Sequence, residues 1–230
     1  MSAMAIGATV AGLSEATGLG GKSTGKSRRT AGHGVEPRFT TKDSLIMLVD
    51  HQTGTIDWVK SLPVATVIAS CRVLTRMATA YDIPLVLTTT MEEVVGPTIP
   101  DIRSLDPEAY EHRYKRGGQL SCWDDDHLRS GVESLGRKNI ILAGLTTDIC
   151  LFWAAHDAVS LGYRVMVVAD ACGTMTSLGD QLTYDRLRGL GVVVTVTNQV
   201  VTELVDNFGT PEGKKAQQIM AEEIISKLGK

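Results

Sequence analysis

The sequence lacks a long apolar run, a cysteine pair of the C-x-x-C type and a strong excess of either charge. Apolar stretches such as 45–49 and 165–169 are far shorter than the roughly 20 residues of a membrane-spanning helix. The net charge of −3 gives nucleic acid or an acidic membrane no electrostatic reason to bind. These absences predict a soluble protein that acts on a small molecule, with no nucleic-acid and no membrane partner.

The few cysteines are spread through apolar surroundings. They are Cys71, Cys122, Cys150 and Cys172. Such thiols suit a reducing compartment better than a disulfide framework, so the expected location is the cytoplasm. With 230 residues, 43% of them hydrophobic, the chain can bury a substantial core within one domain.

Charge is placed unevenly along the chain. Residues 1–42 carry six basic and two acidic side chains, so this head has a charge of +4 against −7 for the rest. Between Gly18 and Gly34 the residues are mostly Gly, Ser, Thr, Lys and Arg, which offer too little apolar surface to offset the entropy of ordering. We therefore expect a flexible basic tail over residues 1–38 and a folded domain over residues 39–230.

The tail contains GGKSTGKS, from Gly20 to Ser27, which fits the phosphate-loop pattern G-x-x-x-x-G-K-[ST]. A phosphate loop needs a buried strand before it and a helix after it, so that backbone N–H groups converge on the phosphates. Here the upstream residues are small and weakly apolar, and Gly32, Gly34 and Pro37 stand where the helix belongs. The flanks favour a chance similarity, but the aspartate-ended strand 45–50 keeps a nucleotide hydrolase as an alternative.

Apolar runs rich in Val, Ile and Leu indicate buried parallel strands. They lie at 45–50, 83–89, 139–144, 163–170 and 191–197, with a weaker candidate near 111–116. Segments with helical spacing alternate with them, over 64–81, 128–135 and 149–162. This alternation predicts an α/β fold of three layers, α/β/α, with a doubly wound, mostly parallel sheet of six strands in the order 3-2-1-4-5-6.

In such a sheet, ligands bind beyond the carboxyl ends of the strands where the strand order reverses. The first strand ends at Asp50, and the strand 139–144 leads through a short turn to Cys150. A cysteine at a helix N-terminus is expected to favour the thiolate, which is the nucleophilic form. A carboxylate beside it disfavours a second anion unless a cation joins them. Lys115 and Arg116 are the candidates, and alternation along an extended segment allows only one of them to reach the crevice.

Three segments carry a resemblance to the isochorismatase-like cysteine hydrolases, over about residues 43–205. They are 46-IMLVDHQTG-54, 116-RGGQLSCWDD-125 and 144-GLTTDICLFWAAHDAVSLGYRVMVVADACGT-174. The resemblance implies a catalytic triad of Asp50, a basic residue and Cys150. The sequence is most similar to a bacterial branch with the motif R-x-G-Q-I-N-A-W, which implies Arg116 as the basic residue, with Lys115 one step away.

The resemblance also implies a non-proline cis peptide at Leu145–Thr146 and an oxyanion hole that involves Thr146, Ile149 and Cys150. Hydrolysis of a small amide or a related C–N bond through a thioester follows from these roles. A ligand-binding or redox-responsive relative without turnover is the alternative of a different class.

The places of further residues in these motifs also imply contacts with the substrate. The expected substrate contacts are Gln52, Lys115, Gln119, Cys122 and Trp123, of which Cys122 either lines the pocket or fills space. No cluster of the kind that holds the metal of nicotinamidases is visible, so no metal and no cofactor are expected. Members of the family often form oligomers, and segments 197–208 and 214–228 suit either subunit contacts or packing on the same chain.

Overall fold

A computed structural model describes residues 37–229 of the chain. The phosphate-loop motif and almost all of the predicted tail therefore lie outside the described residues. Within the described part, no helix is long and apolar enough to cross a membrane.

The centre of the domain is a sheet of six parallel strands in the order β3-β2-β1-β4-β5-β6, which confirms the predicted fold class and strand order. The strands are β1 (Ser44–Val49), β2 (Leu85–Thr90), β3 (Tyr114–Arg116), β4 (Asn139–Gly144), β5 (Arg164–Val168) and β6 (Val193–Thr195). The weak candidate near 111–116 is the edge strand β3. Because β1 and β4 pair in parallel from Ser44–Asn139 to Val49–Gly144, the residues that follow them emerge side by side.

Helices join the strands and cover both faces of the sheet. The longer ones are α2 (Val64–Ala80), α6 (Asp126–Ser134), α7 (Phe152–Ser160), α8 (Ser177–Gly189), α9 (Thr197–Val205) and α10 (Pro211–Met220). The short ones are α1 (Thr53–Ile56), α3 (Glu92–Val95), α4 (Pro100–Arg103), α5 (Pro107–Glu111) and α11 (Ser226–Leu228). Single turns occur at Cys122–Asp124 (η1), Thr147–Leu151 (η2), Ala169–Ala171 (η3) and Ala221–Ile225 (η4).

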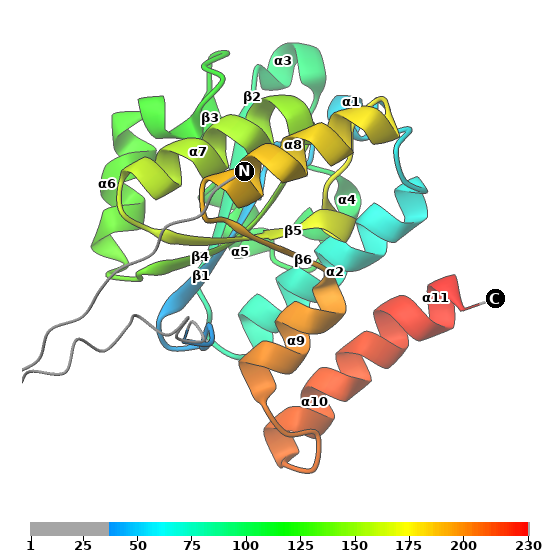
Figure 1. Cartoon of the computed structure of the whole chain (residues 1–230). Coiled ribbons are helices and arrows are strands. Elements are labelled where there is room, and N and C mark those ends of the chain that lie inside the picture. Colours follow the sequence, from blue (N-terminus) through cyan, green and yellow to red (C-terminus); the bar gives the residue numbers. More distant parts are fainter. Residues whose placement is uncertain (1–36, 230) are drawn as a thin grey trace, which may run out of the picture. The chain divides into compact units, whose positions relative to one another are not determined.

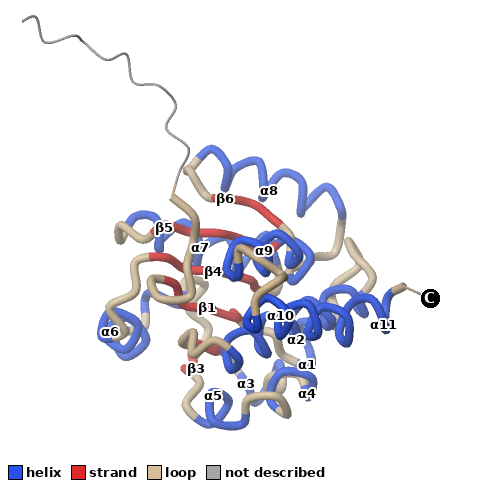
Figure 2. The backbone as a smooth tube through the Cα atoms, turned by 90° about the horizontal axis from the view of Figure 1, so that it is seen from below, coloured by secondary structure: helices blue, strands red, loops and turns tan. Residues whose placement is uncertain are grey.

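The two helical layers are visible from both directions of view. Helices α6, α7 and α8 lie on one face of the sheet, and α2 and α9 lie on the other, with α10 packed beside α2 (Figures 1 and 2). The strand order reverses between β1 and β4, because the chain runs from β1 to β2 in one direction across the sheet and from β4 to β5 in the other. Since the crossovers are right-handed, the helices of these two halves lie on opposite faces of the sheet. The reversal positions the site described below.

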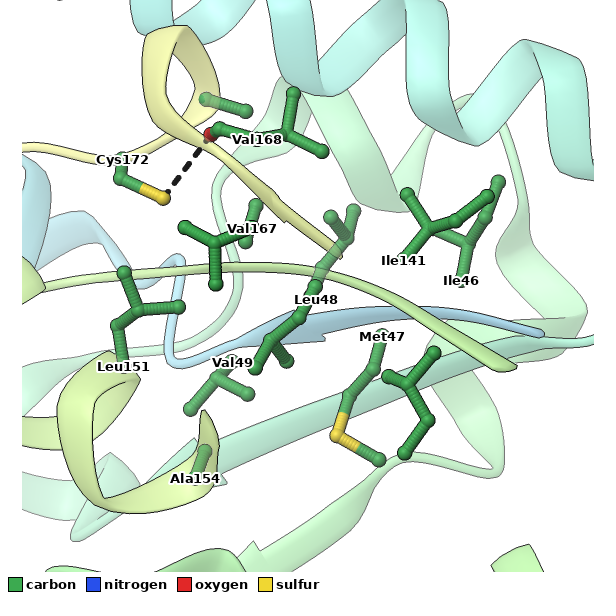
Figure 3. Close-up of a cluster of buried hydrophobic side chains, with 14 of the residues drawn as sticks. Ile46, Met47, Leu48, Val49, Ile141, Leu151, Ala154, Val167, Val168 and Cys172 are labelled. Carbon is green, nitrogen blue, oxygen red and sulfur yellow. Dashed lines mark hydrogen bonds between the residues drawn. The ribbon is translucent and has the colours of Figure 1, made fainter. Parts of the chain in front are cut away.

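The hydrophobic core lies on both sides of β1, every residue of which is buried. Figure 3 shows the β1 side chains Met47, Leu48 and Val49 gathered with those of β5 and with Leu151 from the turn before α7. Cutting a fully buried leucine of this kind to alanine typically costs about 3–5 kcal/mol. Cys172 belongs to the same core, since its thiol is fully buried and donates to the Val168 carbonyl at 3.1 Å.

The C-terminal helices pack on the same chain. Val201 of α9 and Ala216 and Ile219 of α10 form a second apolar cluster with Val73 and Met77 of α2. Segments 197–208 and 214–228 were expected to serve either in subunit contacts or in packing on the same chain, and the structure shows packing on the same chain. The buried Glu223 carboxylate fixes this packing, because it accepts hydrogen bonds from two arginines of α2.

Candidate active site

Asp50 is the first residue beyond β1, and its carboxylate is held from two sides. The Thr88 hydroxyl at the end of β2 donates to Oδ1 at 2.7 Å, and Arg116 Nη2 donates to Oδ2. The side chains of Asp50 and Arg116 are both 0% exposed, so the ion pair is dry. Asp50 also has a φ of 56°, a left-handed conformation that costs about 1–3 kcal/mol outside glycine and is typical of functional sites.

The pairing of β3 with β2 decides between the two basic candidates. Thr90 is opposite Arg116, which points inward to Asp50 and also donates to the Gln119 carbonyl. Lys115 points to the other face, where its side chain is 59% exposed and its Nζ lies 3.6 Å from a Glu92 carboxylate oxygen. The prediction that only one of the two reaches the crevice is confirmed, and the expectation that Lys115 contacts substrate is wrong.

Cys150 lies in the turn Thr147–Leu151 that follows β4, and it is 9% exposed. Burial and the neighbouring Asp50 carboxylate together raise the pKa of its thiol to about 12, although the Arg116 guanidinium opposes both. This corrects the expectation of a favoured thiolate: desolvation and a neighbouring anion outweigh the helix N-terminus. The free thiol therefore keeps its proton at neutral pH.

The turn before Cys150 has the cis peptide bond at Leu145–Thr146 that the resemblance implies. The Thr146 carbonyl accepts hydrogen bonds from the Ile149 and Leu151 N–H groups, each at 3.2 Å. The Ile149 N–H is thus already engaged, so an oxyanion would compete with a carbonyl for it. This differs from the expected oxyanion hole, in which that N–H group is available.

A cavity of about 130 Å³ opens over Cys150 at this edge of the sheet. Its lining residues are Thr55, Trp58, Thr90, Met91, Val95, Gly118, Gln119, Leu120, Leu145, Thr146, Ile149 and Cys150. Larger hollows of about 390 and 510 Å³ lie along α2, but Cys150 lines neither. We therefore take the smaller cavity as the active-site pocket. Gln119, one of the expected substrate contacts, is among its lining residues.

Gln52 does not reach the pocket, which corrects its assignment to substrate. Its side chain is 0% exposed: Oε1 accepts from the Thr90 N–H at 2.8 Å, and Nε2 donates to the carbonyls of Thr90 at 2.8 Å and Gly96 at 2.6 Å. These bonds join the end of β1 to the end of β2 and to the turn after α3. Gln52 therefore holds the wall of the pocket and cannot contact a ligand in it.

Trp123 and Cys122 are also corrected, since both lie behind the pocket. Trp123 is 3% exposed, stacks on Tyr163 with ring centroids 5.4 Å apart, and donates from Nε1 to the Ala154 carbonyl at 2.8 Å. Cys122 is fully buried, and burial raises its thiol pKa. Of the two roles left open for Cys122, the structure shows space filling, and the polar end of Trp123 is satisfied inside the core.

Several residues of the site were not assigned from the sequence. Thr88 orients the Asp50 carboxylate, and the Thr55 hydroxyl donates to the Asp50 carbonyl at 2.6 Å. The walls Trp58 and Leu120 come from loops away from the strand ends, whereas Met91 directly follows β2. A usable signal was present for Thr88, since the run TTT at 88–90 ends a strand next to β1.

Within residues 37–229, no group of three or more His, Cys, Asp and Glu side chains is placed to hold a metal ion. His51, next to Asp50, is fully buried, and its Nε2 lies 2.9 Å from the Ala171 carbonyl oxygen. Burial lowers the pKa of His51 to about 4, so the ring is neutral at pH 7.

The fold and the site define an α/β/α protein with a cysteine-lined pocket at the carboxyl edge of a doubly wound sheet. The model of the isochorismatase domain matches residues 44–199, and the chain belongs to this family of hydrolases. It is 29% identical over 168 residues to the probable hydrolase YcaC of Escherichia coli, covering 73% of this chain and 80% of YcaC.

Other relatives agree with this placement. Isochorismatase domain-containing protein 2 of Danio rerio is 26% identical over 185 residues, which cover 80% of this chain and 90% of that protein. The crystal structure of E. coli YcaC, an octameric hydrolase of unknown specificity, superposes with a TM-score of 0.78 at 26% identity, over 85% of this chain and 96% of YcaC. The chain is accordingly a hydrolase with the isochorismatase fold.

Proposed function

We propose that this hydrolase cleaves a small amide or a related C–N bond through a thioester on Cys150, with Asp50 as the proton acceptor and Arg116 as the residue that orients it. The observation that carries the proposal is the buried Asp50–Arg116 pair next to the thiol that lines the pocket. The raised thiol pKa fits this assignment, because a thiol that keeps its proton needs a base within reach.

The reaction begins when Asp50 accepts the thiol proton and the sulfur attacks the carbonyl carbon of the substrate. Negative charge develops on the carbonyl oxygen, and we assign the Cys150 backbone N–H as a donor to it. The tetrahedral intermediate collapses as Asp50 gives the proton to the leaving nitrogen and the C–N bond breaks. Asp50 then deprotonates a water molecule, which attacks the thioester to form a second tetrahedral intermediate. This intermediate collapses as the C–S bond breaks, which releases the acid, and Asp50 returns the proton to the thiol.

Arg116 has a different role, because a guanidinium with a pKa above about 12 does not exchange protons at pH 7. Its two Nη groups bind the Asp50 carboxylate and the Gln119 carbonyl, so it fixes the carboxylate and links it to the rim of the pocket. It also lowers the cost of the thiolate that forms during attack.

The test is a panel of small amides assayed with the wild-type protein and the Cys150→Ala variant. We expect hydrolysis only with the thiol present, and acid quenching should trap the acyl group on the peptide that contains Cys150, detected by mass spectrometry. Cys71→Ala is the matched control, since Cys71 is fully buried in α2 away from the pocket and should be dispensable. Turnover that survives in Cys150→Ala would refute the mechanism and leave the family assignment in place.

We also propose that the protein forms a homo-oligomer. E. coli YcaC is octameric, and the described part of this chain exposes Met175, Leu178 and Leu182 at and beside the start of α8, each more than half exposed. Apolar side chains grouped in this way are typical of subunit interfaces. Light scattering on the wild-type protein and on a Leu178→Ser, Leu182→Ser variant tests this proposal, which predicts dissociation of the variant.

A further inference from the structure

The active-site pocket has apolar walls, and this property bears on the substrate. The walls are formed by Trp58, Met91, Val95, Leu120 and Ile149 around the Cys150 thiol. Four of these side chains are unusually open for large apolar groups, with exposed fractions from 41% for Ile149 to 55% for Leu120. An apolar pocket with open walls beside a nucleophile is suited to cover the apolar part of a ligand.

No Asp, Glu, Lys, Arg or His of the described residues lines this pocket. Asp50 and Arg116 behind the thiol are paired with each other, and Glu92 outside the pocket is paired with Arg113 and Lys115. A carboxylate or an ammonium group on the substrate would therefore lose its water on entering and find no counter-charge.

Some of the hydroxyl and amide groups of the lining are already hydrogen-bonded within the protein. The Thr55 hydroxyl donates to the Asp50 and Gln52 carbonyls and accepts from the Gln52 N–H. The Gln119 amide oxygen accepts from the Gly117 N–H at 3.0 Å. The Thr146 hydroxyl, by contrast, has no hydrogen-bond partner among the described residues. Uncharged groups of this kind can bind a neutral amide but supply no counter-charge, so recognition beyond the amide rests on shape and apolar contact.

The volume sets the size of the group that fits. At about 30 Å³ for a small group such as a water molecule, a cavity of about 130 Å³ takes roughly four such groups. We infer that the substrate is a neutral amide whose acyl part is a short aliphatic chain of roughly three to five carbons. This inference rests on the proposed function, since it names the substrate class of the same site.

The test uses amides that differ in one property at a time. In the series acetamide, propionamide, butyramide and valeramide, kcat/KM should rise about fourfold per methylene until the pocket is full. 4-Methylpentanamide and succinamate have the same shape but differ in charge, and the neutral compound should be favoured about a hundredfold. β-Alaninamide, the cationic counterpart of butyramide, should be disfavoured similarly.

A variant places a charge in the wall. Leu120→Lys should narrow or reverse the preference for 4-methylpentanamide over succinamate, because the ammonium group supplies the missing partner. Leu161→Lys is the matched control: Leu161 is also an exposed leucine, at the end of α7 and outside the pocket, so the preference should not change. If Leu120→Lys alters only the association state in light scattering and leaves the preference unchanged, the wall belongs to a subunit contact and the inference is wrong.

Binding is measured separately, so that the two proposals can fail separately. Ligand-observed NMR on Cys150→Ala gives the dissociation constants of the same compounds without turnover. If succinamate binds and reacts as well as its neutral counterpart, the substrate class is wrong while the cysteine mechanism stands. If the neutral amides bind selectively but the wild type hydrolyses none of them, the mechanism is wrong while the ligand class stands. If neither compound binds, the inference is overturned.

Discussion

Removing the Asp50 charge should make Cys150 more reactive to an alkylating reagent while it strongly lowers the rate of turnover. The Asp50 carboxylate raises the pKa of the Cys150 thiol, and Arg116 lowers it. With a pKa of about 12, roughly one thiol in 10⁴ is ionised at pH 8. Asp50→Asn removes the anion and leaves the guanidinium, so the pKa falls and the thiolate fraction rises about tenfold per unit.

The two measurements therefore move in opposite directions. Alkylation by iodoacetamide follows the thiolate fraction, so Cys150 of Asp50→Asn should react at least about tenfold faster than the wild type at pH 8. Amide hydrolysis requires the proton acceptor, and kcat should fall by about 10²–10⁴. Arg116→Gln should lower both rates, because it removes the cation and leaves the anion.

Unfolding is the main confounding effect, since an unpaired buried guanidinium costs about 3–5 kcal/mol. Cys71 and Cys172 are both 0% exposed and serve as internal controls, because they react only when the chain opens. Asp148→Asn is the matched control variant: Asp148 lies in the same turn, but the charged groups that shift the Cys150 pKa are Asp50 and Arg116. Slower or unchanged alkylation of Cys150 in a folded Asp50→Asn protein would refute the electrostatic reasoning.

Three further predictions follow from other contacts. Thr88→Val removes a buried donor to Asp50, so it should lower the unfolding free energy by about 1–3 kcal/mol and reduce kcat more than KM, measured by urea titration and kinetics. The arginine and lysine partners of Glu223 hold its pKa at about 2 in the folded protein, against roughly 4.5 in the unfolded chain. The Glu223 carboxylate therefore stabilises the fold above pH 4.5, and this stabilisation disappears as the pH falls toward 2. Glu223→Gln should thus cost about 3 kcal/mol at pH 7 and much less at pH 3, and equal losses at both pH values would contradict this. Deletion of residues 1–36, or Lys26→Ala, should leave amide hydrolysis intact, whereas loss of activity together with loss of ATP binding would favour the phosphate-loop alternative.

The fold was predictable because its signals are local and repeated. Buried strands appear as apolar runs, and their alternation with helices allows few topologies. The same logic places Asp50 and Cys150 together, since parallel strands that pair side by side end at the same edge. The alternation of side chains along a strand also predicts that only one of Lys115 and Arg116 reaches the site.

The errors concern residues whose partners are distant in the sequence. Gln52 and Trp123 look like ligand contacts because of their places in the family motifs, but their polar atoms are satisfied by backbone groups at 90, 96 and 154. The direction of the Cys150 pKa shift was predicted wrongly for a related reason. A helix N-terminus is visible in a sequence, whereas the burial that outweighs it depends on loops such as those of Trp58 and Leu120.

The buried ion pair, the high thiol pKa and the apolar pocket make sense together. A dry pair of Asp50 and Arg116 is costly to stability, and the left-handed backbone of Asp50 adds to that cost. The same dryness leaves the charges unscreened, so the carboxylate acts strongly on the proton of Cys150. A neutral apolar substrate would preserve this environment by displacing water from the pocket, whereas a charged one would bring water and a competing charge next to the pair. The electrostatics of Asp50, Arg116 and Cys150 therefore favour the same class of substrate as the walls of the pocket.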